Sequence, residues 1–171
     1  RLAIYRIYRI VWMSVKFFLQ VTLFQRRYKG RWTPVTNEKW ERLVTKQAKE
    51  YKRTALKLGG LMIKMGQFLS TRADIMPPSF IAELEGLTDR VPAVRRKDAM
   101  ALLEEVWNTS HSDYVENLSD KPVASASIGE VYKGTLKDGT PVAVKIQRPD
   151  IDRILRADFR AMKIVIWLVK R

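Results

Sequence analysis

A lysine and a short loop of small residues are the parts of this sequence whose chemistry is easiest to name. The loop spans Ala124 to Val131, "ASASIGEV", and Lys145 follows sixteen residues after Gly129 in the stretch "VAVK". A tight loop presents backbone N–H groups, and a lysine ammonium adds a positive charge with three donors. Both kinds of donor suit phosphate oxygens. The sequence therefore predicts a phosphate-binding site made by this loop and Lys145.

The spacing of the loop matches the glycine-rich nucleotide loop of protein kinases, G-x-G-x-x-G-x-V. The residues at the matching positions are Ala124, Ser125, Ala126, Ser127, Ile128, Gly129, Glu130 and Val131, with alanine in the first two glycine places. Lys145 then stands where a kinase keeps the lysine that holds the α- and β-phosphates. We assign nucleotide binding to these loop residues except Glu130, and both a catalytic and a nucleotide-binding role to Lys145. The alternative is a structural β-meander with an exposed lysine.

Alanine in a phosphate loop has a specific physical cost. Its Cβ excludes most conformations with φ > 0 and keeps the N–H groups from closing tightly on phosphate oxygens. We therefore expect a stiffer loop that fits the nucleotide differently. The hydroxyls of Ser125 and Ser127 are candidate donors in compensation, although serine is also common in turns.

A second pair of polar residues lies in "KMGQ", where Lys64 and Gln67 are three positions apart in a predicted helix. Residues at this spacing project together from one side of a helix, so both side chains are aimed at one place. Gly66 between them allows another helix to approach closely. The alternative is two polar residues on a solvated helix face.

Together the two motifs resemble the UbiB family of atypical protein-kinase-like proteins, also called the ABC1 or ADCK family. "KMGQ" is similar to its K-x-G-Q signature, and "VASASIGEVYKG" followed by "VAVKIQRP" is similar to its alanine-rich loop and lysine strand. The resemblance implies a helical extension folded over a kinase active site, with Lys64 and Gln67 gating the pocket. It also implies that the alanine-rich loop restrains ordinary kinase activity and alters nucleotide preference.

The resemblance further implies ATP and Mg²⁺ as cofactors, and a role in isoprenoid-quinone or prenyl-lipid metabolism. The chain begins with Arg and ends inside an apolar helical pattern, so we interpret it as part of a longer protein. The catalytic loop and the metal ligands are then expected beyond Arg171, and no acidic partner for Lys145 can be named. The alternative function is an inactive pseudokinase scaffold that anchors a lipid-metabolism complex. Glu130 and Tyr132 depart from the family, which usually has Gln and often His there.

The elements that must position these residues give an α+β fold, with a helical N-terminal extension followed by the antiparallel small lobe of a kinase-like fold. We predict a basic arm at 1–35, a helical K-x-G-Q extension at 36–112 and a partial small lobe at 113–171. One helix should begin near Thr36 or Asn37 and should end or bend at Gly59 and Gly60. Period-two patterns predict strands at 123–127, 130–136 and 142–147. In the last helix we expect a buried face made by Ile154, Leu155, Phe159, Met162, Val165 and Ile166.

The N-terminal arm carries most of the positive charge. The net charge is +14, and residues 1–53 contain 14 Lys and Arg against 3 Asp and Glu. The apolar run from Ile10 to Phe24 is shorter than the ~20 residues that span a bilayer, and basic and aromatic residues flank it. We therefore predict a helix lying in a membrane interface. The alternatives are a helix packed on the rest of the protein and a nucleic-acid-binding arm.

These features indicate a peripheral protein on the inner face of a plasma, thylakoid or organellar membrane. The expected partners are membrane lipids or prenyl-lipid intermediates and proteins of quinone biosynthesis, with no nucleic acid. The chain has no cysteine, which excludes disulfides and thiolate metal sites. The single histidine, His111, lies in a polar turn and receives no role, so we predict no metal site within these residues.

Overall fold

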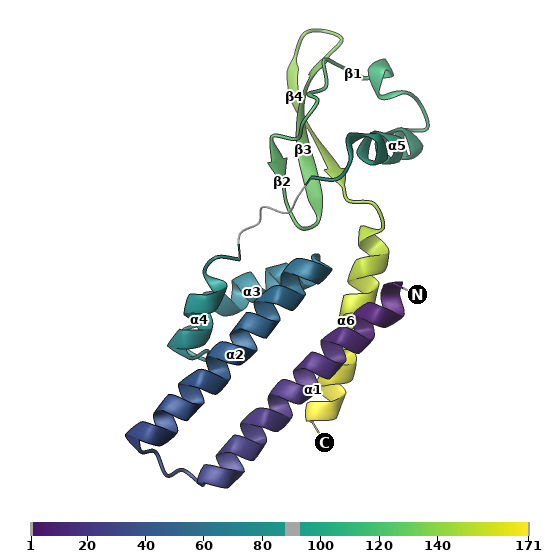
Figure 1. Ribbon diagram of the computed structural model, residues 1–171. Helices are drawn as coiled ribbons and strands as arrows, with labels where there is room; N and C mark the ends of the chain where they lie inside the picture. The colour runs from purple at the N-terminus through teal and green to yellow at the C-terminus, as the bar shows by residue number, and fades with distance from the viewer. Residues whose placement is uncertain (1, 88–92, 171) are drawn as a thin grey trace. The chain divides into compact units, whose positions relative to one another are not determined.

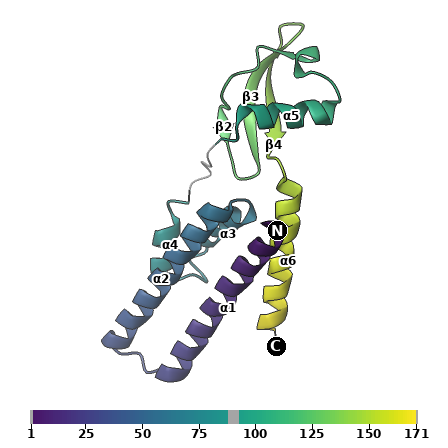
Figure 2. The same ribbon diagram turned by 45° about the vertical axis from the view of Figure 1, so that its right-hand side comes forward.

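The computed structural model describes residues 2–87 and 93–170, and the chain divides into two compact units. One unit is mostly helical and contains Arg1–Thr88 together with Asp152–Arg171. The other contains Asp89–Ile151 and holds the sheet. Figures 1 and 2 draw both units from two directions. The fold is α+β, with helices first and a small antiparallel sheet after them, as the sequence predicts.

Among the described residues, the helical unit contains α1 (Leu2–Tyr28), α2 (Pro34–Leu58), α3 (Leu61–Ser70), α4 (Pro78–Leu84) and α6 (Ile151–Val169). Helices α1 and α2 run side by side in both views, and α6 lies along α1 (Figures 1 and 2). The core contains Ile10 and Met13 of α1, Val44, Ala48, Tyr51 and Ala55 of α2, Met62 and Ile63 of α3, and Phe80 and Leu84 of α4. The first and last helices of the chain therefore belong to one packed unit.

Local sequence signals explain the ends of α2 and α3. Thr33 caps α2, and its side chain accepts a hydrogen bond from the backbone N–H of Thr36 at 3.2 Å, with Pro34 in the first turn. The helix therefore begins at Pro34, two or three residues before the predicted start at Thr36 or Asn37. Gly59 and Gly60 have φ values of 65° and 60°, which end α2 and lead directly into α3. That boundary confirms the prediction from the glycine pair.

The buried face of α6 differs from the prediction. Its most buried residues are Ala157, Asp158 and Ala161, whereas Phe159 and Ile166 are 52% and 50% exposed. The prediction of a face that includes these two large residues was therefore wrong. The physical reason is that α6 turns Asp158 inward, and this orientation leaves part of its large apolar side chains on the outside.

Within residues 93–151 of the sheet unit, the structure has α5 (Arg96–Trp107), a 3₁₀ turn at His111–Asp113 and four strands. The strands are β1 (Val115–Glu116), β2 (Ala124–Ser125), β3 (Gly129–Leu136) and β4 (Pro141–Gln147). Strand β3 pairs antiparallel with all three others. The predicted meander of three strands is confirmed as β2, β3 and β4. The short strand β1 was not predicted, because two residues cannot display a period of two.

Helix α5 covers one face of the sheet (Figure 1). The core of this unit joins Ala99, Met100 and Leu103 of α5 to Val115, Tyr132, Val144 and Ile146 of the strands. Side chains alternate between the two faces along each strand. The residues between these buried positions, among them Val131 and Lys145, therefore belong to the face that α5 does not cover.

Candidate nucleotide-binding site

Three predicted site residues lie in a row across the sheet. Ala124 of β2 pairs with Val131 of β3, and Val131 pairs with Lys145 of β4. Directly paired residues on antiparallel strands have their side chains on the same face. Ala124 and Lys145 are exposed and Val131 is half-buried. The structure thus joins two apolar side chains and an exposed ammonium on the face opposite α5.

The side chain of Lys145 is exposed to solvent on this face. Within residues 2–87 and 93–170, no carboxylate forms an ion pair with Lys145. Its neighbours across the sheet are the small apolar side chains described above, which cannot compete for its N–H donors. An exposed ammonium with no carboxylate beside it is suited to bind an anion such as a phosphate group.

The alanine-rich loop is a tight turn between β2 and β3. Ala126 N–H donates to Gly129 C=O at 2.8 Å, so Ser127 and Ile128 form the tip, and Ile128 is exposed there. No residue from 124 to 131 has a positive φ. The turn therefore uses only conformations that alanine adopts without strain. The expectation that such a loop is stiffer and fits the nucleotide differently stays a prediction.

Gly129 is needed for a reason that the sequence alone did not reveal. A Cβ at this position would lie 2.9 Å from the backbone oxygen of Ile146 on the neighbouring strand. The sequence assigned Gly129 to nucleotide binding, and the close approach that the structure shows at this glycine is to β4. Glycine at this position keeps the first residue of β3 against the lysine strand.

The two serines of the loop have different surroundings. Ser125 Oγ donates to Glu130 Oε1 at 3.1 Å and accepts from Arg148 Nη2 at 2.9 Å. Ser127 is 2% exposed, and its Oγ has no hydrogen-bond partner within the part of the chain that the structure describes. A buried hydroxyl without a partner is unfavourable by about 1–3 kcal/mol. The nucleotide contact expected of Ser127 stays a prediction.

Behind the loop, on the α5 side of the sheet, lies a buried carboxylate. Glu130 is 2% exposed, and it accepts from Val94 N–H at 2.6 Å and from Tyr132 Oη at 3.0 Å. Arg148 Nη2 lies 3.5 Å from Glu130 Oε1. Burial, followed by the hydrogen bond to Glu130, raises the pKa of Tyr132 to about 12. The two departures from the family pattern thus bond to each other.

Sequence reasoning missed Arg148. The residue was quoted only as part of "VAVKIQRP", directly after the lysine strand, and was given no role. A single arginine after a strand carries no local signal of its contacts, because Ala126 and Ser125, which its side chain contacts, are 22 and 23 positions earlier in the chain. The only available hint was its place between a strand and a proline.

Lys64 and Gln67 lie in α3 of the helical unit. Gln67 Nε2 donates to Leu87 C=O at 3.1 Å, and Lys64 is exposed. A Cβ at Gly66 would lie 2.7 Å from Leu87 Cδ1 and 2.9 Å from Tyr51 Cε1, so the predicted close approach at this glycine is confirmed. The role of Lys64 and Gln67 as a gate over the nucleotide pocket stays a prediction.

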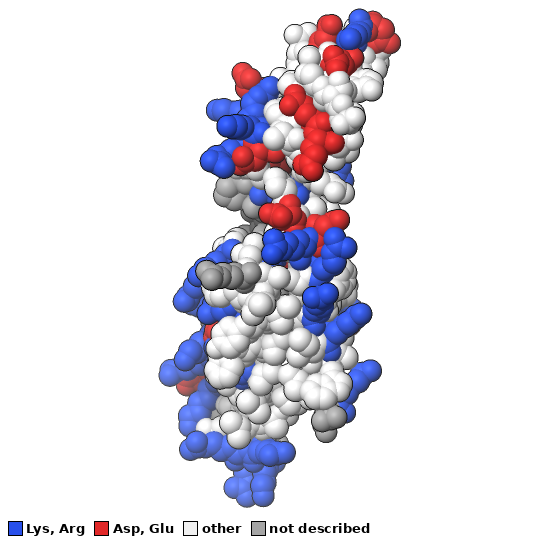
Figure 3. Space-filling model, turned by 90° about the vertical axis from the view of Figure 1, so that its right-hand side faces the viewer, with Lys and Arg blue, Asp and Glu red and all other residues white. Residues whose placement is uncertain are grey.

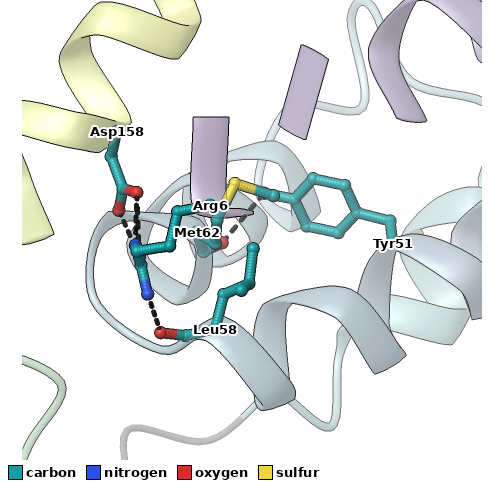
Figure 4. A network of polar contacts seen from close by, with 5 residues as sticks. All are labelled: Arg6, Tyr51, Leu58, Met62 and Asp158. Carbon is teal, nitrogen blue, oxygen red and sulfur yellow. Dashed lines mark hydrogen bonds and ion pairs between the residues drawn. The ribbon is translucent and has the colours of Figure 1, made fainter. Parts of the chain in front are cut away.

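A buried ion pair joins α1 to α6 (Figure 4). Arg6 of α1 donates to both carboxylate oxygens of Asp158 of α6, at 2.7–3.0 Å, and also to Leu58 C=O at the end of α2. Burial is the main cause that raises the pKa of nearby Tyr51, with Asp158 adding to it, and Tyr51 Oη donates to Met62 C=O at 2.8 Å. Both carboxylate oxygens of Asp158 therefore bind Arg6.

The helical unit also contains an apolar cavity of about 640 Å³. Residues of α1, α2, α3, α4, α6 and the segment between α3 and α4 line it. Among the described lining residues are the methionines Met13, Met62, Met65, Met76 and Met162. Methionine side chains are flexible and polarisable, so they adapt to apolar ligands of irregular shape. The cavity is large enough for part of a hydrocarbon chain.

Comparison with known protein families gives a match that covers the sheet unit. A family model described as the ABC1 atypical kinase-like domain matches residues 86–171. These residues include the alanine-rich loop, the lysine strand and α6. The match therefore includes the three strands that carry the row of Ala124, Val131 and Lys145.

Several curated proteins are similar over more of the chain. A probable protein kinase UbiB from Azotobacter vinelandii is 30% identical over 177 residues, which cover 99% of this chain and 33% of that protein. Another from Aeromonas salmonicida is 40% identical over 115 residues, covering 67% and 21%. The chloroplastic protein ACTIVITY OF BC1 COMPLEX KINASE 3 of Arabidopsis thaliana is 37% identical over 132 residues, covering 77% and 19%. The chain therefore spans a third or less of the length of these relatives.

Proposed function

This chain belongs to the ABC1 atypical kinase-like family, and from that premise we propose that it supplies the nucleotide-binding small lobe of an atypical kinase or ATPase of the UbiB type. The observation that carries the proposal is the row of Ala124, Val131 and Lys145 on the sheet face that α5 leaves open. The buried hydroxyl of Ser127 has no hydrogen-bond partner among the described residues, which supports a phosphate-bearing ligand at the same loop.

Each residue has a defined task in this proposal. Mg-ATP supplies the phosphoryl group and its divalent cation. Lys145 neutralises negative charge on the α- and β-phosphates, Ala124 and Val131 form the apolar wall next to the ammonium, and Ser127 donates to a phosphate oxygen. Lys64 and Gln67 restrict access to the pocket. The proposal assigns no ligand of the cation to this chain, which spans a third or less of the length of its relatives.

Titration calorimetry with Mg-ATP on the full-length protein tests the assignment of Lys145. A charge-assisted contact to phosphate contributes about 2 kcal/mol, so Lys145→Ala should weaken binding about 30-fold. Lys137→Ala is the matched control, because Lys137 is an exposed lysine in the turn after β3. Equal affinities of wild type and Lys145→Ala would refute the assignment. Tight binding without turnover would favour the pseudokinase scaffold.

We also propose that α1 attaches the protein to a membrane surface. Among the described residues, α1 is the one helix that is long and apolar enough to cross a bilayer by length and composition alone. Its inner face buries Arg6, Ile10 and Met13, whereas its outer face exposes Ile4, Tyr8, Trp12, Leu19 and Leu23. Figure 3 shows a broad uncharged surface on the helical unit, bordered by Lys and Arg. A helix with one face packed on protein and one face apolar supports peripheral attachment.

Flotation with lipid vesicles tests the membrane proposal. The wild type should float with anionic vesicles and less with neutral ones, because apolar insertion and basic residues act together. Leu19→Glu and Leu23→Glu should reduce flotation. Val106→Glu, at an apolar residue of α5 that is 72% exposed, is the control and should leave flotation unchanged. Retention of a nucleic acid probe without any vesicle binding would refute the proposal.

The lipid partner that we propose for the helical unit is a prenyl-lipid intermediate. The methionine-lined cavity of about 640 Å³ supports a flexible apolar chain as its occupant. Val165→Trp should fill part of the cavity and abolish binding of a fluorescent farnesyl probe, since Val165 lines it. Lys163→Trp on the exposed side of the same helix is the control. A prenyl-lipid role would be refuted by equal probe binding in both variants.

A further inference from the structure

Arg148 donates hydrogen bonds to Ser125, Ala126 and Ile128 of the alanine-rich loop. Its Nε donates to Ala126 C=O at 2.8 Å, and its Nη2 donates to Ser125 Oγ at 2.9 Å. Its backbone N–H donates to Ile128 C=O at 3.1 Å. The planar guanidinium has donors at fixed angles, so two side-chain contacts to adjacent loop residues define the loop position in two directions. The backbone contact holds the tip of the turn.

The guanidinium is itself anchored by the buried carboxylate of Glu130. Arg148 Nη2 lies 3.5 Å from Glu130 Oε1, and the Arg148 side chain is 16% exposed. Glu130 is held in turn by the N–H of Val94, which precedes α5, and by the hydroxyl of Tyr132 within β3. The loop is therefore connected through Arg148 to a polar network that extends to two other elements of the sheet unit.

This network lies on the opposite face from the phosphate-binding lysine. Ser125 pairs with Glu130, and Glu130 pairs with Ile146, whose side chain is in the core under α5. Lys145 is on the alternate face. The Arg148 charge is partly compensated by Glu130 and its donors are directed at the loop. Arg148 therefore acts on a nucleotide through the shape of the loop and not by contact.

We propose that Arg148 is a positioning residue that holds the alanine-rich loop in its closed shape before a nucleotide arrives. In a loop of glycines the phosphates themselves draw the backbone around them. Here the closed shape is set from behind by Arg148 and Glu130, so the loop opens rarely and bound nucleotide leaves slowly. The inference rests on the proposed nucleotide function and adds a residue that controls the rate of nucleotide release.

Hydrogen exchange on the nucleotide-free, full-length protein tests the first half of the inference. The amide of Ala126 is bonded within the turn, and Arg148→Ala should speed its exchange by about tenfold or more, since local opening sets the exchange rate. Propylguanidinium should restore protection in this variant, whereas propylammonium, which has no planar fork, should not. Arg95→Ala is the control, because this arginine of the same unit is exposed.

Stopped-flow release of a fluorescent ADP analogue tests the second half. Release should be about tenfold faster in Arg148→Ala and should slow again with propylguanidinium, a result that a general loss of stability does not produce. If Arg148→Ala does not fold, Ser125→Ala removes one of the contacts and should give a smaller change, about twofold to threefold, in both measurements.

The outcomes separate this inference from the proposed function. Unchanged Ala126 exchange in the Arg148 and Ser125 variants would overturn the inference, even if Lys145→Ala abolishes nucleotide binding. Faster exchange with unchanged nucleotide release would also overturn it. Failure of the wild type to bind any nucleotide would overturn the proposed function and, with it, the control of nucleotide release. The contact of Arg148 with the loop would still be tested by hydrogen exchange, which needs no nucleotide.

Discussion

Breaking the ion pair between Arg6 and Asp158 should strongly destabilise the helical unit. The two side chains are only 3% and 2% exposed, and they join residues 152 positions apart in the chain. Arg6→Met keeps most of the apolar volume of the arginine and removes its charge. The carboxylate of Asp158 then stays buried without its cation, and Leu58 C=O loses a donor.

The loss of unfolding free energy follows from the groups that Arg6→Met leaves without a partner. Removing one partner of a buried, hydrogen-bonded ion pair costs about 3–5 kcal/mol, mostly because the other charge is uncompensated. The unpaired carbonyl adds about 1 kcal/mol. Domains are stable by only ~5–15 kcal/mol, so this single change removes a large part of the total. Replacing both residues by apolar ones, Arg6→Met with Asp158→Leu, removes both charges and should recover most of the loss.

A double-mutant cycle measured by urea unfolding gives the coupling energy directly. We expect a coupling of about 3 kcal/mol or more for Arg6 with Asp158. The matched control is the exposed pair of Arg42 with Glu38 on α2, whose side chains are 77% and 62% exposed. That pair should couple by about 0.5 kcal/mol or less. A loss below 1 kcal/mol in Arg6→Met, close to the control, would refute the reasoning.

Two further predictions concern the sheet unit. Gly129→Ala should lower its unfolding free energy by about 1–3 kcal/mol in urea titrations, because the new Cβ would meet the backbone oxygen of Ile146 at 2.9 Å, and an unchanged midpoint would contradict this. Tyr132 has its pKa raised to about 12 when folded, so its stabilising contribution is complete below the unfolded pKa near 10. That contribution, roughly 2–3 kcal/mol, is lost as pH rises from about 10 toward 12. Tyr132→Phe should flatten this part of the stability curve relative to wild type, and parallel curves would argue against the assignment.

Much of the fold could be predicted because its signals are local. The three strands of the meander follow a period of two, and Gly59 with Gly60 marks a helix boundary at the position where the structure has one. The site row of Ala124, Val131 and Lys145 follows from strand spacing once the strands pair in this register. The two-residue strand β1 was missed because it is too short to show a pattern.

The exposed apolar face of α6 shows where local reasoning fails. Its sequence predicts a buried face that includes Phe159 and Ile166, because periodicity reports which residues share a face but not what covers that face. Which side turns inward depends on a partner from another part of the chain. Here the partner is Arg6, and its attraction for Asp158 sets the orientation of the helix.

By itself, the sequence determined the order of the helices and strands, the small residues of the loop and the separation between that loop and its lysine. These features depend on residue types a few positions apart, whose effect on the backbone is short-ranged. Only the tertiary structure decided that Arg148 holds the loop from behind, that Glu130 anchors Arg148, and that Arg6 meets Asp158. Each of those contacts joins segments that approach only after the chain has folded, so their energies are not encoded in any local pattern.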